Sequence, residues 1–173
     1  MAQQINLMKQ LLIIRHAKSS WDTSILKDFD RPLNERGLKD APAMAKRLLE
    51  RKISINSFIS STAKRAFTTA TFFYERYKKA GYKTTGVIGI EELYLAPPKV
   101  FESIICNVND ALDTIAIFAH NPGITEFANE LTNTRIDEMP TCSVFAVKIE
   151  TDSWKDFADA KKSFWFFDCP KRG

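Results

Sequence analysis

Only two histidines occur in this 173-residue chain, and each follows a short apolar run. His16 comes after Arg15 and the run at residues 11–14, and His120 comes after Ala119 and the run at residues 114–118. Such runs are typical of buried strands. In an open α/β sheet, ligands bind outside the carboxyl ends of the strands, so both imidazoles are predicted to meet at a catalytic edge. A single histidine would more often be structural, but the matched placement of the two favours a site.

Two arginines share this placement. Arg15 closes the first run, and Arg65 lies in the first turns of a helix predicted after the strand at residues 57–60. An arginine at the apolar end of a strand is costly to desolvate unless it binds an anion, and its planar guanidinium matches phosphate oxygens. A backbone amide after His120, at the start of the next helix, adds a donor for the same anion. For Arg65 alone, a solvated helix position is an equally good interpretation.

Four blocks of sequence resemble the histidine phosphatase (phosphoglycerate-mutase-like) superfamily, in that family's order. They are residues 15–22 (RHAKSSWD), 30–37 (DRPLNERG), 61–70 (STAKRAFTTA) and 119–123 (AHNPG). The short chain and the forms of the first and last blocks are most similar to the SixA-like phosphohistidine phosphatase branch. The 54 residues between Arg65 and His120 leave little room for the large cap that longer relatives insert there.

The resemblance implies a role for each matching residue. His16 is the nucleophile and forms a phosphohistidine that water hydrolyses, while Arg15, Arg65 and His120 bind and stabilise the phosphoryl oxygens. Ser19 and Asn121 are secondary candidates for phosphate hydrogen bonds. Phosphoryl transfer is mainly positioning and electrostatics, so neither a metal nor another cofactor is expected. The chain departs from the family at Ala17, where glycine is usual, and at Asp22, which receives no role.

Glu92 is the candidate proton donor, since residues 91–94 lie near the place where larger relatives carry an acid. A solvated glutamate is the competing interpretation. A phosphomonoester leaves as a poor alkoxide and benefits from an acid, whereas the N–P bond of phosphohistidine has an easily protonated leaving group. The prediction is therefore a phosphatase acting on phosphohistidine in a protein. A small-molecule phosphomonoesterase and a non-catalytic phosphate-binding module remain as alternatives.

The pattern of elements predicts how these residues are positioned. Strands are expected at residues 11–14, 57–60, 84–90 and 114–118, and helices at residues 35–49, 62–79, 97–109 and 122–131. The first helix begins after Asn34, a good N-cap residue. Two further strands, at residues 142–149 and 161–167, form a C-terminal hairpin, and the aromatic residues 164–167 are expected in the core rather than in an interaction patch. The expected fold is α/β: a single domain over residues 1–173, with a mostly parallel central sheet flanked by helices on both faces.

Composition sets the broad class of protein. Apolar residues make up 45% and charged residues 27%, which is ordinary for a globular domain. The net charge is 25 − 21 = +4, too small to indicate a nucleic-acid partner. The sequence shows no secretory signal or membrane span, and the three cysteines lack metal-site spacing. A cytoplasmic protein is expected, with a phosphorylated protein or a small phosphate ester as partner and no nucleic acid or membrane.

Overall fold

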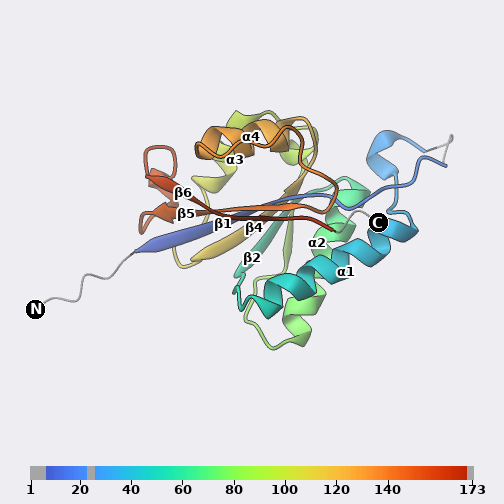
Figure 1. Cartoon of the computed structure of the whole chain (residues 1–173), viewed down its shortest axis with the longest axis horizontal. Helices are drawn as coiled ribbons and strands as arrows, with labels where there is room; N and C mark the ends of the chain where they lie inside the picture. The colour runs from blue at the N-terminus through green and yellow to red at the C-terminus, as the bar shows by residue number, and fades with distance from the viewer. Residues whose placement is uncertain (1–6, 23–25, 171–173) are drawn as a thin grey trace, which may run out of the picture.

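The computed structural model describes residues 7–22 and 26–170, and a six-stranded sheet forms its centre (Figure 1). The strand order is β3-β2-β4-β1-β5-β6. The bounds in chain order are β1 (Met8–Arg15), β2 (Ser57–Ser61), β3 (Val87–Ile90), β4 (Thr114–Ala119), β5 (Val144–Glu150) and β6 (Lys162–Asp168).

The strand directions correct one prediction. β3, β2, β4 and β1 run parallel to their neighbours, but β5 pairs antiparallel with β1, and β6 pairs antiparallel with β5. The sheet is therefore mixed, and the expectation of a mostly parallel sheet was only partly right. The predicted C-terminal hairpin is confirmed, and it extends the sheet directly. β5 is buried over Val144 to Val147, because it lies next to the central strand β1 rather than at an edge.

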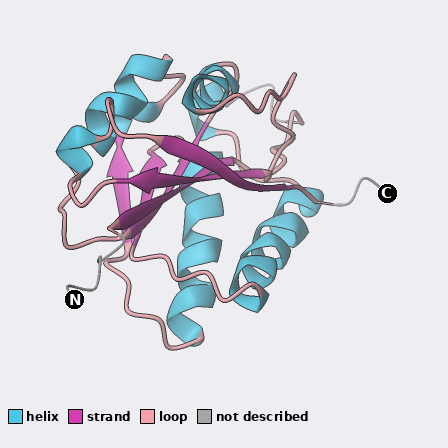
Figure 2. Ribbon diagram, turned by 60° about the vertical axis from the view of Figure 1, so that its left-hand side comes forward, coloured by secondary structure: helices cyan, strands magenta, loops and turns pink. Residues whose placement is uncertain are grey.

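Helices cover both faces of the sheet, as the sequence predicts (Figures 1 and 2). α1 (Glu35–Glu50) and α2 (Lys64–Lys79) pack on one face, and α3 (Pro98–Ile105) and α4 (Gly123–Leu131) pack on the other. Alternate residues of β1 serve the two cores: Leu12 and Ile14 face α1 and α2, whereas Leu11 and Ile13 face α3 and α4. α3 ends earlier than the predicted helix over residues 97–109.

The start of α1 lies against the loop that follows His16. The side chain of Asn34 caps the helix by accepting a hydrogen bond from the Gly37 N–H at 2.9 Å, and the Asn34 N–H donates to the Lys18 carbonyl at 3.0 Å. A Cβ on Gly37 would come within 2.1 Å of that same carbonyl oxygen. Only glycine allows this approach, so the first turn of α1 is held directly beside Lys18.

The aromatic segment at residues 164–167 does form a strand, but it is not a core strand. β6 is the edge of the sheet, and its residues are half-buried or exposed, with Phe164 40% exposed. The sequence pattern was misleading because an edge strand has a neighbour on one side only.

Over the described residues, no helix has both the length and the apolar character needed to cross a membrane.

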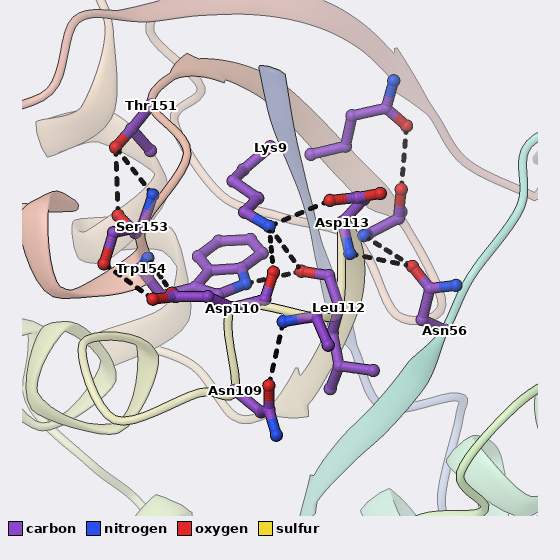
Figure 3. Close-up of polar contacts among 12 residues, drawn as sticks. Lys9, Asn56, Asn109, Asp110, Leu112, Asp113, Thr151, Ser153 and Trp154 are labelled. Carbon is purple, nitrogen blue, oxygen red and sulfur yellow. Dashed lines mark hydrogen bonds and ion pairs between the residues drawn. The ribbon is translucent and has the colours of Figure 1, made fainter. Parts of the chain in front are cut away.

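A buried lysine holds together the end of the sheet opposite the histidines (Figure 3). Lys9 is only 3% exposed, and its Nζ donates to the carbonyl oxygens of Asp110 (2.5 Å) and Leu112 (3.2 Å) and to Oδ1 of Asp113 (2.9 Å). The indole N–H of Trp154 also donates to the Leu112 carbonyl, at 2.7 Å. β1 and the loop before β4 are thus tied at one ammonium group, and the loop between β5 and β6 joins them at the Leu112 carbonyl.

We expect Lys9→Met to destabilise the fold without changing the site. The substitution removes three hydrogen bonds from a buried position, which costs about 1–3 kcal/mol in the free energy of unfolding. Lys161→Met is the matched control, because Lys161 is 75% exposed and forms only a surface ion pair with Glu150. Urea unfolding of both variants measures the difference. A Lys9→Met protein as stable as the control would contradict a structural role for the ammonium group.

Candidate active site

The two histidines lie side by side because β1 and β4 are neighbours. These strands pair in parallel with Arg15 opposite Ala119, so His16 and His120 leave the sheet at the same edge. The His16 N–H donates to the Ala119 carbonyl at 3.1 Å, and the two ring centroids are 5.2 Å apart. Both residues are buried, with exposed fractions of 7% and 1%.

Hydrogen bonding orients the His16 ring. Nδ1 lies 2.7 Å from the Ala17 carbonyl oxygen, which can only accept, so Nδ1 carries the proton in this contact. The lone pair is therefore on Nε2, where the Arg65 Nε–H donates at 3.3 Å. The loop itself is held by the Ala17 N–H, which donates to Thr69 Oγ1 at 3.0 Å. His16 thus presents an unprotonated nitrogen next to a guanidinium.

His120 is held by Ser61. Its Nε2 lies 2.8 Å from Ser61 Oγ, and that hydroxyl already accepts from the Ala63 N–H at 3.2 Å. The hydroxyl is therefore suited to donate to Nε2, which leaves the ring proton on Nδ1. Nδ1 is buried and has no hydrogen-bond partner among the described residues. His120 therefore offers a donor for a group placed at this edge.

Both imidazoles are neutral. Burial, with the nearby positive charges of Arg65 and Arg15 adding to it, lowers the pKa of each ring from its ordinary 6.5 to about 3. A neutral nucleophile needs no deprotonation before attack, and the site keeps this state throughout the physiological pH range.

This lowered pKa predicts that acid destabilises the fold. Between about pH 3 and 6.5 the unfolded histidines bind protons that the folded ones do not, so stability present above pH 6.5 is lost as the pH falls. From pH 7 to pH 5 the loss is about 2 kcal/mol for each histidine. Urea unfolding in phosphate-free buffer tests this, with His120→Gln expected to remove about half of the dependence. Equal free energies of unfolding at pH 7 and pH 5 would contradict it.

Arg65 connects His16 to a carboxylate. It is 2% exposed, and its Nη1 and Nη2 donate to the backbone oxygen and Oδ2 of Asp28, at 2.6 and 3.0 Å. The Tyr94 hydroxyl donates to the same Oδ2 at 2.6 Å, and Arg31 pairs with Oδ1 at 3.0 Å. Partial burial opposes ionisation of Asp28, but the Tyr94 hydrogen bond and the two arginines hold the pKa of its carboxyl below the ordinary value. Asp28 is therefore a carboxylate, and it fixes the plane of the Arg65 guanidinium.

Arg15 is held by residues of the loop before β5. Its Nη1 donates to Oε1 of Glu138 at 3.1 Å and to the Met139 carbonyl at 2.7 Å. Its Nε is buried and has no hydrogen-bond partner within the described part of the chain. The Cys142 N–H donates to the backbone oxygens of both Arg15 and His16 at 3.1 Å, so the loop before β5 closes this side of the site.

These groups suit a tetrahedral oxyanion. Two guanidiniums flank two neutral imidazoles, and the unpartnered Arg15 Nε and His120 Nδ1 are donors for oxygen. The carboxylates now paired with the arginines, Asp28 and Glu138, have side chains 46% and 70% exposed, so both ion pairs border solvent. A phosphoryl group bound here would meet a lone pair on His16 Nε2 and positive charge on two sides.

The structure places the remaining predicted residues less directly. Ser19 is buried in the loop after His16 and pairs with Leu33 through an isolated bridge. The Asn121 amide donates to Glu138 Oε1 at 3.1 Å and accepts from Thr125 at 2.7 Å. Glu92 is exposed in the short helix η2 (Glu91–Leu93). Among the described residues, no hydrogen bond or ion pair joins Glu92 to either histidine.

Four residues that hold the site side chains in place were not predicted from the sequence: Asp28, Tyr94, Ser61 and Thr69. Ser61 and Thr69 stand in the block that contains Arg65, which is one helical turn from Thr69, so that block carried a usable signal. Asp28 and Tyr94 come from loops 66 residues apart, and no spacing in the sequence indicates that they meet. Across the described residues, no group of three or more His, Cys, Asp or Glu side chains is arranged to hold a metal ion.

One family model matches the part of the chain that carries Arg15, His16 and Arg65. The model of the histidine phosphatase superfamily (branch 1) matches residues 11–86, and this match confirms the predicted resemblance. An uncharacterized chloroplastic protein of Arabidopsis thaliana is 28% identical over 158 residues, which cover 87% of this chain and 71% of that protein.

Solved structures with the same fold include SixA proteins. A protein proposed to be the phosphohistidine phosphatase SixA of Nakamurella multipartitia aligns with a TM-score of 0.80 at 20% identity, over 94% of this chain and 96% of that one. The protein histidine phosphatase SixA in complex with tungstate gives 0.77 at 18% identity, over 92% and 96%. A mycobacterial glucosyl-3-phosphoglycerate phosphatase gives 0.63 at 15% identity, over 91% and 97%. These likenesses show the fold.

Proposed function

We propose that this chain, a match to the histidine phosphatase superfamily over residues 11–86, hydrolyses phosphohistidine on a protein through a phosphohistidine formed on its own His16. The observation that carries the proposal is the His16 ring. Its Nδ1 proton is committed to the Ala17 carbonyl, and the lone pair of its Nε2 faces the Arg65 guanidinium. The resemblance in fold to a SixA that binds tungstate, a tetrahedral oxyanion, supports a phosphate-binding site in this fold.

The reaction has two steps. His16 Nε2 attacks phosphorus, and a new N–P bond forms as the N–P bond of the substrate breaks. The electron pair of that bond stays on the leaving imidazole nitrogen, which takes a proton from solvent water. Water then attacks the phosphorus on His16, and phosphate and neutral His16 are released. Arg15, Arg65 and the Nδ1–H of His120 stabilise the equatorial oxygens in both steps.

The titratable groups near the site favour a labile leaving group. The pKa of Asp28 is held low by Tyr94 and the arginines against partial burial, so this side chain is not protonated at neutral pH. The hydrogen bond to Asp28 is the main cause that raises the pKa of Tyr94, which makes that hydroxyl a poorer acid. An alkoxide needs general-acid help, whereas a phosphohistidine leaving group does not. This arrangement supports phosphohistidine over an alkyl phosphate.

Glu92 was the sequence candidate for that acid, and its position leads us to expect a small effect. Glu92 lines a surface pocket with Ile90, Lys99 and Ile104, and neither histidine lines that pocket. We expect Glu92→Gln to change kcat/KM by less than about threefold for phosphohistidine and alkyl esters alike, as for its exposed neighbour in Glu91→Gln. A fall of tenfold or more on alkyl esters alone would assign Glu92 as the acid, because general-acid help is worth about 10²–10⁴-fold.

A panel of substrates tests the proposed function. The wild-type protein is given a phosphohistidine peptide, 4-nitrophenyl phosphate and glycerol phosphate, and the specificity constants are compared. We expect the phosphohistidine peptide to be the best substrate and glycerol phosphate the worst. A preference for glycerol phosphate would replace the proposal by a small-molecule phosphomonoesterase. The mycobacterial glucosyl-3-phosphoglycerate phosphatase, which shares the fold, is named for an activity of that class.

A non-catalytic phosphate-binding module is the second alternative. It would use the arginines without a nucleophile, so the oriented lone pair on His16 speaks against it. Acid-labile, base-stable phosphate on His16 after brief incubation with a phosphodonor separates the two functions. The predicted cytoplasmic location and the phosphorylated protein partner are part of this proposal.

A further inference from the structure

A basic groove adjoins the proposed phosphoryl site on the side of α1. It has a volume of about 280 Å³ and is lined by Arg15, Lys18, Arg36, Glu138, Pro140 and Thr141. Because Arg15 and its partner Glu138 belong to both places, the groove lies next to the proposed phosphoryl site. Three cations line it, against the single carboxylate of Glu138.

The cations of the groove are available for a ligand. Among the described residues, the Lys18 ammonium group has no hydrogen-bond or ion-pair partner. The Arg36 guanidinium uses its Nε for Asp40 at 3.3 Å, and within the same residues its two Nη groups have no partner. Lys18 is half-buried and Arg36 is 54% exposed, so both charges lie where a bound anion replaces only part of their hydration.

The backbone fixes the two cations beside each other. The Lys18 carbonyl accepts from the Asn34 N–H, and Gly37 lies so close to that carbonyl that any Cβ would collide with it. Arg36 is the residue before Gly37, so this close approach brings the first turn of α1 against the loop that carries His16. Backbone contacts of the fold therefore place Lys18 and Arg36 at the same groove.

We propose that this groove is a subsite for an acidic side chain next to the phosphorylated residue of the protein substrate. The proposal rests on the proposed function and narrows its substrate class. The residues directly before and after the phosphorylated one lie nearest to it, since consecutive Cα atoms are about 3.8 Å apart, and the groove shares Arg15 with the phosphoryl site. On the far side of Glu138 lies a pocket with Glu126 and Asp137, where an acidic residue is repelled. The acidic neighbour therefore occupies the side of Lys18 and Arg36.

Peptide binding tests the subsite without turnover. Four peptides carry a non-hydrolysable phosphonate analogue of phosphohistidine, with Asp or Asn placed directly before or directly after it. Calorimetry at low salt is expected to show one Asp peptide binding about tenfold more tightly than its Asn counterpart, since each exposed charge pair contributes up to about fivefold. The preference should fade at 1 M salt, where the screening length drops to about 3 Å.

Variants assign the preference to the groove. Lys18→Gln combined with Arg36→Gln should remove the Asp preference and weaken the Asn peptides by less than about threefold, since those pairs are exposed. Lys46→Gln is the matched control, an exposed lysine farther along α1 that pairs with Glu50 and should keep the preference. Equal binding of Asp and Asn peptides, or a preference that survives the double variant, overturns the subsite alone. Binding of no peptide at all overturns the subsite together with the proposed phosphohistidine substrate.

Discussion

We expect His16→Ala to lower kcat/KM by at least about a thousandfold, because loss of a nucleophile removes the covalent route altogether. Among the described residues, no other side chain at this edge combines an oriented lone pair with a hydrogen bond from a guanidinium. His120 is the closest alternative, but its Nε2 is held more closely, at 2.8 Å from Ser61 Oγ against 3.3 Å between His16 Nε2 and Arg65 Nε, and its free Nδ1 is a donor. The measurement is the initial rate on a phosphohistidine peptide, with urea unfolding to confirm that the variant is folded.

Trapping the intermediate supplies the second readout for His16. Wild-type protein quenched early in turnover should carry base-stable, acid-labile phosphate that maps to His16, and the His16→Ala protein should carry none. Retention of more than about a tenth of the wild-type rate would reject the nucleophile, because a lost nucleophile costs several powers of ten. Phosphate that maps to another residue would reject it as well.

The second large effect is expected for Arg65→Lys. A lysine keeps the positive charge but lacks the fork that donates to Asp28 and His16 together. Removal of one preorganised donor to a transition-state oxyanion typically costs about 10²–10³-fold in kcat. We therefore expect kcat to fall by about this amount while the protein stays folded, with a smaller change in KM.

Arg31→Lys is the matched control for Arg65. Arg31 pairs with the other oxygen of Asp28 and stacks on Trp21 at 3.8 Å, and among the described residues it forms no hydrogen bond with His16. Its effect on kcat should stay below about tenfold, because Asp28 keeps its bonds from Arg65 and Tyr94. If the two variants lose the same activity, the shared carboxylate rather than the Arg65 guanidinium is what the reaction requires.

Local sequence features predicted most of the elements and both histidine positions. The apolar runs before His16 and His120 form neighbouring buried strands, and Asn34 caps α1 as expected. These features succeed because strand burial and helix capping depend on residues close in the sequence. The direction of β5 and the half-exposed edge position of β6 were not predictable in this way, since both depend on which strand each one meets.

For the site, too, the residue types could be read from the sequence, whereas the contacts between distant segments could not. The sequence by itself identified the candidate residues: two histidines and two arginines whose types and positions are those expected of a phosphoryl-transfer site. Only the tertiary structure decided how they are held. Asp28 and Tyr94 come from distant loops to orient Arg65, Glu92 stays at the surface, and Gly37 brings Lys18 and Arg36 to one groove. The physical reason is that these contacts join segments far apart in the chain, and only the packing of both helix layers on the sheet brings such segments within hydrogen-bonding distance.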